Sequence, residues 1–473
     1  FSTMDGKKVM MNSVTINYFI KRLILIKNIY KYSPFPLKCL MATIQGYYLS
    51  KIRYDKNFQK RVDKYLRRES WSSHEWLNYQ EKKLEKLLLE SRKYVPFYRN
   101  YWSKKNDSSL NLENWPIISK TMIMKNPQLF IDDRYRNNRL YKDHTSGTTG
   151  TPLDIYLDYD SVREQYAFFH ARVKLKYGIK FNDKWAIIGS QRVVRAEKNK
   201  APFWVYNFFS SQIYFSSLHI AEWSYADYFK AMQSFQPRYL ISYTSSIYEL
   251  AKFFHNEQWS FTFKAIITNA EPLFDYQRKL LEKVFRCPII ETYGQAELVC
   301  FANTFPDGTM RESPDMGITE IIKDNDNDKY GKLIATGFIN KAMPLIRYDT
   351  DDLISKKSTF KKNNTGLPLF NKILGRSDDI ISTSDGRKIV QIDGIFSDGI
   401  DIISGQIIQN TLTDFTIKVV PGKNWNDECR VQLKKNFLER INSVNVNIIG
   451  CSTIKKTWAG KHRVIISKLN EKV

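Results

Sequence analysis

Cysteine and long apolar runs are both scarce in this chain. Its five cysteines form no C-x-x-C pair, which argues against a disulfide framework and against a structural zinc site. The longest apolar stretch, Ile16 to Ser50, is interrupted by five lysines and arginines, so no segment has the pattern of a membrane-spanning helix. The cysteine usage fits a reducing compartment and no secretory leader pattern is visible, so we expect a cytoplasmic protein.

Acidic residues are few relative to basic ones. The chain has 49 Asp and Glu residues and 73 Lys and Arg residues, which gives a formal net charge of +24. Such a charge attracts polyanions, namely nucleic acid, anionic lipid, nucleotide-linked sugars or an acidic polysaccharide. The basic residues are spread along the chain, without zinc-finger spacing or an aromatic-rich RNA-binding signature, which disfavours nucleic acid. Residues 18–30 mix bulky apolar and basic side chains. This pattern is typical of a helix packed on its own domain, which we favour, or of one lying peripherally on the anionic inner face of a membrane.

The length and the apolar pattern predict an α/β fold. At 473 residues the chain exceeds the size of a single core, and 42% hydrophobic residues describe a folded protein. Apolar residues return at helical spacing over 60–95, whereas short apolar runs alternate with helix-like stretches from about residue 115 to about 370. We predict a helical N-terminal extension over residues 1–84, a large N-terminal α/β core over 85–377, and a small C-terminal α/β domain over 378–473.

The strongest local signal is the hydroxyl-rich loop from Thr145 to Pro152. Its glycines let the backbone turn tightly around a ligand, and its hydroxyls can rotate toward phosphate oxygens. No Walker pattern can be drawn through it. The loop predicts a phosphate site, and an ordinary Ser- and Gly-rich turn is the alternative. The predicted nucleotide-binding residues here are Ser146, Gly147, Thr148, Thr149, Gly150 and Thr151.

This loop and four later motifs, in the same order, resemble those of the adenylate-forming superfamily of acyl-CoA synthetases, luciferases and peptide-synthetase adenylation domains. The later motifs are Glu291-Thr-Tyr-Gly-Gln-Ala-Glu297, Arg347-Tyr-Asp-Thr-Asp-Asp352, Leu374-Gly-Arg-Ser-Asp-Asp379 and Gly460-Lys461. Residues 92–99 and 115–120 are similar to the phenylacetate–CoA ligase branch. Residues 36–54 and Trp71 resemble the longer N-terminus of its capsular polysaccharide biosynthesis (CapK-like) subgroup. The resemblance implies a large multi-subdomain α/β adenylation domain with a small mobile C-terminal α/β domain.

The resemblance also implies a role for each matched residue. Lys461 would be the catalytic residue, Glu297 would hold Mg²⁺, and Asp378 would be the hinge between the domains. The remaining nucleotide contacts would come from Ala270 and Glu271 beside the adenine, Tyr293 and Gly294 at its face, Asp352 at the ribose hydroxyls, and Arg376 at the ribose or phosphate. Four of these residues have a plainer alternative. Tyr293 could be a core tyrosine, Glu297 a solvated glutamate, Asp352 a turn residue and Lys461 a surface lysine.

Three positions depart from the family pattern. Ala296 stands where a Thr or Ser often precedes the glutamate, Asp351 replaces a glycine, and Leu153 replaces a lysine found in many members. The first two predict weaker nucleotide binding. A catalytically degenerate binding protein of the same fold therefore stays an alternative.

The expected reaction is ATP- and Mg²⁺-dependent activation of a small carboxylic acid as acyl-AMP, followed by transfer to an acceptor. An amine or glycan acceptor, giving an amide in surface or capsular polysaccharide biosynthesis, is favoured because the positive chain would attract a polyanionic glycan. Transfer to coenzyme A, as in an acyl- or aryl-CoA ligase, is the alternative. The candidates for lining the acid pocket are Ser190, His219 and the segment 243–246.

Overall fold

The computed structural model describes residues 29–105, 110–145, 152–189, 191–323, 330–355, 366–376, 381–384, 388–389, 395–396, 400–441, 444–457 and 460–469. Its helices are α2 (Phe35–Arg53), α3 (Phe58–Arg67), α4 (Ser73–Tyr94), α5 (Pro96–Trp102), α6 (Lys120–Lys125), α7 (Tyr159–Phe169), α8 (Tyr225–Phe235), α9 (Thr244–Phe254), α10 (Asp275–Phe285) and α11 (Asp427–Leu438). Short 3₁₀ turns are η1 (Arg68–Ser70), η2 (Leu112–Asn114), η3 (Pro127–Phe130), η4 (Asp133–Tyr135) and η6 (Leu175–Tyr177), and η5 (His170–Lys174) is a π-helical turn.

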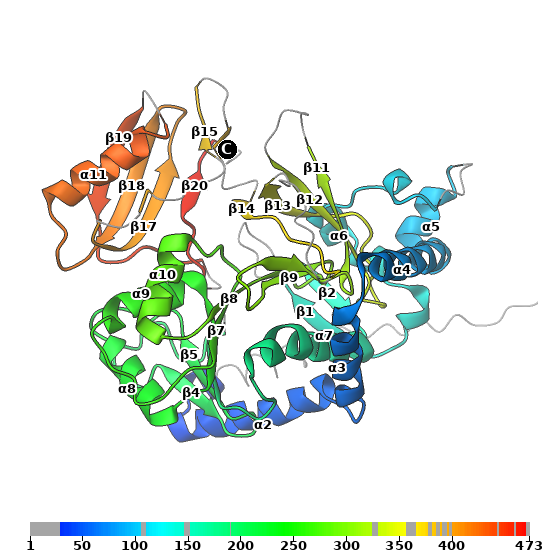
Figure 1. Cartoon of the computed structure of the whole chain (residues 1–473), viewed down its shortest axis with the longest axis horizontal. Helices are drawn as coiled ribbons and strands as arrows, with labels where there is room; N and C mark the ends of the chain where they lie inside the picture. Colours follow the sequence, from blue (N-terminus) through cyan, green and yellow to red (C-terminus); the bar gives the residue numbers. More distant parts are fainter. Residues whose placement is uncertain are drawn as a thin grey trace, which may run out of the picture.

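An eight-stranded sheet organises the large N-terminal part of the molecule (Figure 1). Its order is β10-β9-β8-β7-β6-β3-β5-β4. The strands are β3 (Trp185–Gly189), β4 (Trp204–Asn207), β5 (Gln212–Ser216), β6 (Tyr239–Tyr243), β7 (Ala265–Asn269), β8 (Ile289–Gly294), β9 (Phe301–Thr304) and β10 (Met310–Glu312). The five adjacent strands β5, β3, β6, β7 and β8 are parallel. The apolar runs at 185–188 and 239–243 are two of them, as expected for strands that a parallel sheet buries on both faces.

Two further four-stranded sheets complete the larger architecture. An antiparallel sheet joins β11 (Gly317–Ile322), β12 (Tyr330–Gly337), β13 (Tyr348–Ser355) and β14 (Ile373–Arg376). The C-terminal sheet has the order β19-β18-β17-β20, from β17 (Ile402–Gln409), β18 (Asp414–Pro421), β19 (Asn445–Gly450) and β20 (Ile465–Ser467). Small pairs are formed by β1 (Tyr141–His144) with β2 (Asp154–Leu157), and by β15 (Ile381–Ser382) with β16 (Lys388–Ile389). The mixed α/β architecture with a smaller C-terminal unit confirms the predicted fold class.

The N-terminal helices pack into the body and are part of its core. Helix α4 begins at a capping box in which Ser72 accepts from the Glu75 N–H and the Glu75 carboxylate accepts from the Ser72 N–H. Val62, Tyr65 and Leu88 share one buried cluster with strand β12. The predicted boundary between residues 84 and 85 therefore lies inside α4, and the predicted boundary at 377/378 lies outside the described residues.

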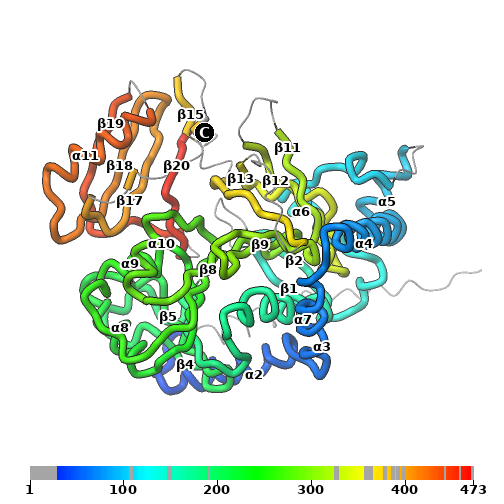
Figure 2. Tube along the Cα trace, viewed as in Figure 1, coloured from blue at the N-terminus to red at the C-terminus, as the bar shows by residue number. Residues whose placement is uncertain are grey.

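The C-terminal sheet lies beside α9 of the large body, and strand β17 contacts that helix (Figure 2). Helix α11 covers this sheet with Cys429, Leu433 and Phe437 in a separate buried cluster. Because the two clusters do not merge, the C-terminal unit has a core of its own. Over the described ranges, no helix combines the length and apolar character needed to cross a bilayer.

Candidate active site

The candidate site forms where the parallel strands β6, β7 and β8 end. Strand partners are in register, so Tyr243 at the end of β6 lies beside Asn269 at the end of β7. Carboxyl ends of parallel strands share one edge, where ligands bind in open α/β sheets. Ala270 follows β7 with a φ of 66°, a left-handed conformation that turns the chain sharply after the strand.

Tyr293, Asp352 and Arg376 come together across two sheets. The Tyr293 hydroxyl donates to Asp352 Oδ2 at 2.7 Å, and Arg376 Nε lies 3.5 Å from Asp352 Oδ1. Asp352 and Arg376 are register partners on β13 and β14. Burial raises the pKa of Asp352, and Arg376 and Tyr293 oppose that shift. The ring of Tyr293 stacks on Phe370 with centroids 5.3 Å apart, a contact that the sequence did not indicate.

Glu297 is a buried carboxylate held by a tyrosine. The Tyr348 hydroxyl donates to Glu297 Oε1 at 2.7 Å, and burial raises the pKa of Glu297 above its ordinary value. Tyr348 was not predicted as a site residue. The signal was present in the period-two alternation of β13, where Tyr348, Thr350 and Asp352 share the buried face.

The chemistry of Glu297 fits the predicted Mg²⁺. No group of three or more His, Cys, Asp or Glu side chains suited to a metal occurs in the described part of the chain. Mg²⁺ in nucleotide enzymes uses one or two carboxylates and completes its shell with phosphate oxygens and water. A single buried carboxylate such as Glu297 would therefore be sufficient as the protein's contribution to a Mg²⁺ site.

Lys461 reaches this site from the C-terminal unit. Its turn is closed by the Thr457 N–H donating to the Lys461 carbonyl at 2.8 Å and by the Lys461 N–H donating to Thr457 Oγ1 at 3.1 Å. The Lys461 ammonium lies 5.9 Å from the centroid of the Tyr243 ring. Burial and the nearby Arg376 lower the pKa of Lys461, while the carboxylates of residues 271, 352 and 297 act against that shift. The structure thus brings the predicted lysine together with four other predicted residues.

Gly460 lets this turn approach the large body closely. Its φ is 78°, and a Cβ built there would lie 2.3 Å from Ser217 Oγ. A side chain would therefore clash with the large body as well as strain the turn.

Glu271 has contacts that the prediction did not include. Its carboxylate accepts from the Ser245 N–H at 2.7 Å, at the start of α9, and from the His462 N–H at 2.9 Å. It therefore joins the large body to the segment carrying Lys461. Gly294 ends β8 opposite Phe301, whose ring would lie 3.0 Å from an added Cβ.

Asp351 adopts a backbone conformation that glycine takes readily. Its φ is 60°, a left-handed value at which Asp is better tolerated than most residues. The Asp349 carboxylate accepts its N–H at 3.0 Å. The departure at this position therefore leaves the backbone conformation in place. Leu153 is 1% exposed and belongs to the main core, so this position serves packing.

Several predicted residues lie outside the described part: the loop residues 146–151, Ser190 and Asp378. The ends of the loop are described and are held together. Thr145 donates its N–H to the Leu153 carbonyl at 2.9 Å and accepts the Leu153 N–H on Oγ1 at 3.0 Å.

His219 is a buried structural histidine. Its Nδ1 shares a 2.7 Å hydrogen bond with Ser216 Oγ, and its ring stacks on Phe203 at a centroid distance of 5.2 Å. Burial lowers its pKa. Of the other pocket candidates, Tyr243 lies under Lys461, and the hydroxyls of Ser245 and Ser246 are buried without a hydrogen-bond partner among the described residues.

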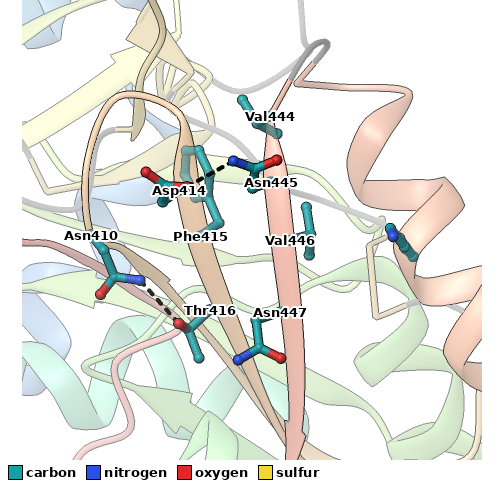
Figure 3. Close-up of a pocket in the computed structure, with 9 residues that line it drawn as sticks. Asn410, Asp414, Phe415, Thr416, Val444, Asn445, Val446 and Asn447 are labelled. Carbon is teal, nitrogen blue, oxygen red and sulfur yellow. Dashed lines mark hydrogen bonds between the residues drawn. The ribbon is translucent and has the colours of Figure 1, made fainter.

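A depression of about 370 Å³ on the C-terminal sheet shares no residue with this site (Figure 3). It lies along β18 and β19. Its polar side chains bond to one another: the Asn445 amide donates to Asp414 at 2.9 Å and the Asn410 amide donates to Thr416 at 3.0 Å. We assign it no role in the chemistry.

Comparison with known proteins gives likenesses over most of the chain. Protein CapK of Staphylococcus aureus is 26% identical over 460 residues, spanning 94% of this chain and all of that protein. A 2-hydroxyisobutyryl-CoA ligase in its postadenylation state, with R3-HIB-AMP bound, has a TM-score of 0.66 at 16% identity over 85% of this chain and 92% of that one. The same ligase with 2-HIB-AMP and CoA in its thioesterification state has a TM-score of 0.51, at 17% identity over 85% and 91%. No family model matches the chain. These likenesses confirm the predicted resemblance to the adenylate-forming superfamily and to its CapK-like subgroup.

Proposed function

We propose that this chain, whose fold is that of the adenylate-forming ligases, joins a carboxylic acid to AMP and then passes the acyl group to an amine. The observation that carries this proposal is that Lys461, over the Tyr243 ring at the end of β6, lies near Asp352 and Arg376 of the antiparallel sheet and near Glu297. A lysine without a function would lie in solvent and would not be buried beside other charged groups. A phosphoryl-transfer site, in contrast, needs cations where negative charge develops in the transition state.

In the first half-reaction an oxygen of the substrate carboxylate attacks the α-phosphorus of ATP, the bond to the bridging oxygen breaks, and pyrophosphate leaves. Lys461 would stabilise the charge on the α-phosphate and orient the carboxylate. Asp352 would accept hydrogen bonds from the ribose hydroxyls. These would replace the hydrogen bond that it accepts from Tyr293. Glu297 would hold Mg²⁺, which supplies charge neutralisation at the phosphates.

The remaining nucleotide contacts are proposed on the motif resemblance. The hydroxyls and N–H groups of residues 146–151 would bind the leaving phosphates. Ala270, Tyr293 and Gly294 would border the adenine, and Arg376 would contact ribose or phosphate. Glu271 would act indirectly, by fixing the segment that carries Lys461.

The second half-reaction requires another arrangement of the C-terminal unit, pivoting near Asp378. The higher TM-score with the postadenylation state than with the thioesterification state supports assigning this structure to the first half-reaction. In the second, the amine nitrogen would attack the acyl carbon, AMP would leave, and an amide would form. The likeness to CapK and the net charge of +24 support a surface or capsular glycan as the carrier of that amine.

Coenzyme A is the second candidate acceptor, since the similar structures compared above are of a 2-hydroxyisobutyryl-CoA ligase. The two acceptors are distinguished by their products, an amide or a thioester.

The acid that we propose carries hydroxyl groups, as a uronic acid does. The buried hydroxyls of Ser245 and Ser246, which have no hydrogen-bond partner among the described residues, lie just after Tyr243, whose ring centroid is 5.9 Å from the Lys461 ammonium. Buried hydroxyls lose free energy unless a ligand supplies partners, so they favour a polar acid over an aryl acid.

The test is pyrophosphate release with ATP and Mg²⁺ across amino acids, uronic acids and aryl acids. Lys461→Ala should lower release by at least about a hundred-fold, the usual scale for losing one charge-stabilising group. Lys468→Ala, an exposed lysine of the same unit, is the matched control and should retain the wild-type rate. Equal release by wild type and Lys461→Ala would show that Lys461 is not the catalytic residue. ATP binding with no release for any acid would favour the degenerate binding protein.

A further inference from the structure

Helix α2 presents a row of large apolar side chains to solvent. Leu37, Leu40, Ile44, Tyr47 and Tyr48 are 40%, 54%, 52%, 47% and 70% exposed. Their spacing of three and four residues places them on one face of the helix. The opposite face packs on the body, with Cys39 and Gly46 buried, so the exposed row is not a consequence of a loosely attached helix.

The row continues onto the turn between β4 and β5. Phe208 and Phe209 are 68% and 50% exposed, and the Phe209 ring meets the Tyr47 ring edge-on at 5.2 Å. The Phe208 N–H donates to Thr43 Oγ1 at 3.1 Å, which fixes the turn against the helix. We call these seven side chains the α2 patch: Leu37, Leu40, Ile44, Tyr47, Tyr48, Phe208 and Phe209. Soluble surfaces scatter such side chains singly, and a contiguous patch marks an interaction site.

The charge around the α2 patch is mainly positive. Between Ile29 and Tyr54 the sequence holds four Lys and Arg residues and no Asp or Glu. The loop 191–200 adds four Lys and Arg residues and one acid, Glu197, beside the start of α2. It is held there by the Tyr30 hydroxyl donating to the Val193 carbonyl at 3.1 Å, and by Arg195 over the Tyr32 ring at 5.5 Å.

We propose that the α2 patch docks this protein on an anionic lipid bilayer, with α2 lying in the plane of the interface. The aliphatic and aromatic side chains would enter the boundary between head groups and acyl chains, where Tyr and Phe are well placed. The surrounding cations would meet the lipid phosphates, each near-surface Lys or Arg adding to the attraction. Charge complementarity favours this occupant, because an apolar protein partner would not require eight Lys and Arg residues and one acid along α2 and the loop beside it.

The position of α2 agrees with such docking. The helix runs along the edge of the large body remote from the C-terminal sheet (Figure 1). A docked protein would therefore keep its C-terminal unit away from the lipid, free to change its arrangement.

The experiment is flotation of the full chain with vesicles of equal parts phosphatidylcholine and phosphatidylglycerol, and with vesicles of phosphatidylcholine alone. We expect binding to the anionic vesicles that weakens as salt rises. The double substitution Leu40→Asn with Ile44→Asn should lower the partition coefficient by at least about ten-fold, since two exposed apolar side chains no longer enter the interface.

The matched control is Leu77→Asn with Leu89→Asn on α4, two leucines that are 57% and 51% exposed away from α2. It should bind vesicles as wild type does. Pyrophosphate release by both double variants checks that each is folded. Equal vesicle binding by wild type and the α2 variant would overturn the proposal, as would the absence of binding to anionic vesicles. If wild type and the α4 control are dimers in gel filtration and the α2 variant is a monomer, the patch would be assigned to contact with a second copy of the chain instead.

Discussion

At the scale of single residues, the role of a side chain at this site depends on its backbone conformation and its hydrogen-bond partners as well as on its residue type. Asp351 departs from the family pattern, and it adopts a left-handed conformation of the kind that glycine takes readily. Tyr348 carries no catalytic chemistry of its own, but its hydroxyl is the hydrogen-bond donor to the buried Glu297 carboxylate.

Tyr348→Phe should therefore weaken the proposed use of Mg²⁺. Without the donor, the pKa of Glu297 rises further and its anionic form is less favoured. We expect the Mg²⁺ concentration at half-maximal pyrophosphate release to rise by about ten-fold, from loss of a hydrogen bond to a charged group. The rate at saturating Mg²⁺ should change much less.

Tyr228→Phe is the matched control. Its hydroxyl is also buried and donates to the Ser216 carbonyl at 2.7 Å, but it lies among the apolar side chains of the large sheet. It should destabilise the fold without changing the Mg²⁺ dependence. The same Mg²⁺ dependence in Tyr348→Phe and wild type would remove Glu297 from the metal site.

At the scale of elements, helix α3 and the turn η5 are joined by aromatic packing around His170. Its ring lies 5.7 Å from that of Phe58 and 5.9 Å from that of Phe181. Burial lowers the pKa of His170 from 6.5 to about 4. The protonated ring is thus disfavoured in the folded state.

This pKa predicts a pH-dependent loss of stability. As pH falls below 6.5 the unfolded chain takes up a proton that folded His170 does not, so unfolding is favoured until the folded group titrates near pH 4. With partial burial taken into account, His170 should account for about 1–2 kcal/mol of the free energy of unfolding lost between about pH 7.5 and about pH 5. Denaturant titrations at both pH values measure it.

His170→Phe should abolish the part of the pH-dependent loss of stability that His170 causes, because a phenylalanine ring does not titrate. His255→Phe, at an exposed position, should leave the pH dependence unchanged. A His170→Phe variant that loses as much stability as wild type on acidification would contradict the assignment.

At the scale of the whole molecule, a few contacts hold the C-terminal unit against the large body. The Lys456 ammonium lies 2.7 Å from Glu249 Oε2 and donates to the Ser217 carbonyl at 3.2 Å. Both side chains of the ion pair are nearly buried, at 13% and 10% exposure. The His462 N–H bond to Glu271 is a second link.

Lys456→Met should slow the first half-reaction selectively. It keeps the apolar stem and removes the charge, so the arrangement that brings Lys461 to the site becomes less populated. We expect pyrophosphate release to fall by about ten-fold or more, while transfer from a supplied acyl-adenylate stays within about two-fold. Rapid-quench measurement of each half-reaction separates them.

Lys423→Met provides the control, since its 4.0 Å pair with Glu222 also joins the two units but is 77% and 66% exposed. Exposed pairs contribute little, so its rates should match wild type. Combining Lys456→Met with Glu249→Gln should slow the reaction no further than either alone, if the pair acts as a unit. Equal slowing of both half-reactions by Lys456→Met would indicate a general loss of structure.

The sequence by itself determined the fold class and proposed the residues of the site. Alternating apolar runs require a parallel sheet with helices, because only strands buried on both faces are apolar without interruption. The resemblance of the motifs singled out Tyr293, Glu297, Asp352, Arg376 and Lys461, which the structure brings near one another from two sheets and the C-terminal unit.

Only the tertiary structure decided which partners these groups have. Tyr348 joins Glu297 across 51 residues of sequence, and Glu271 meets His462 across 191. Such contacts depend on strand register and on how the two units are placed, which no local pattern encodes. The same holds for α2: its sequence is apolar on both faces, and the packing of one face on β4 left the other exposed.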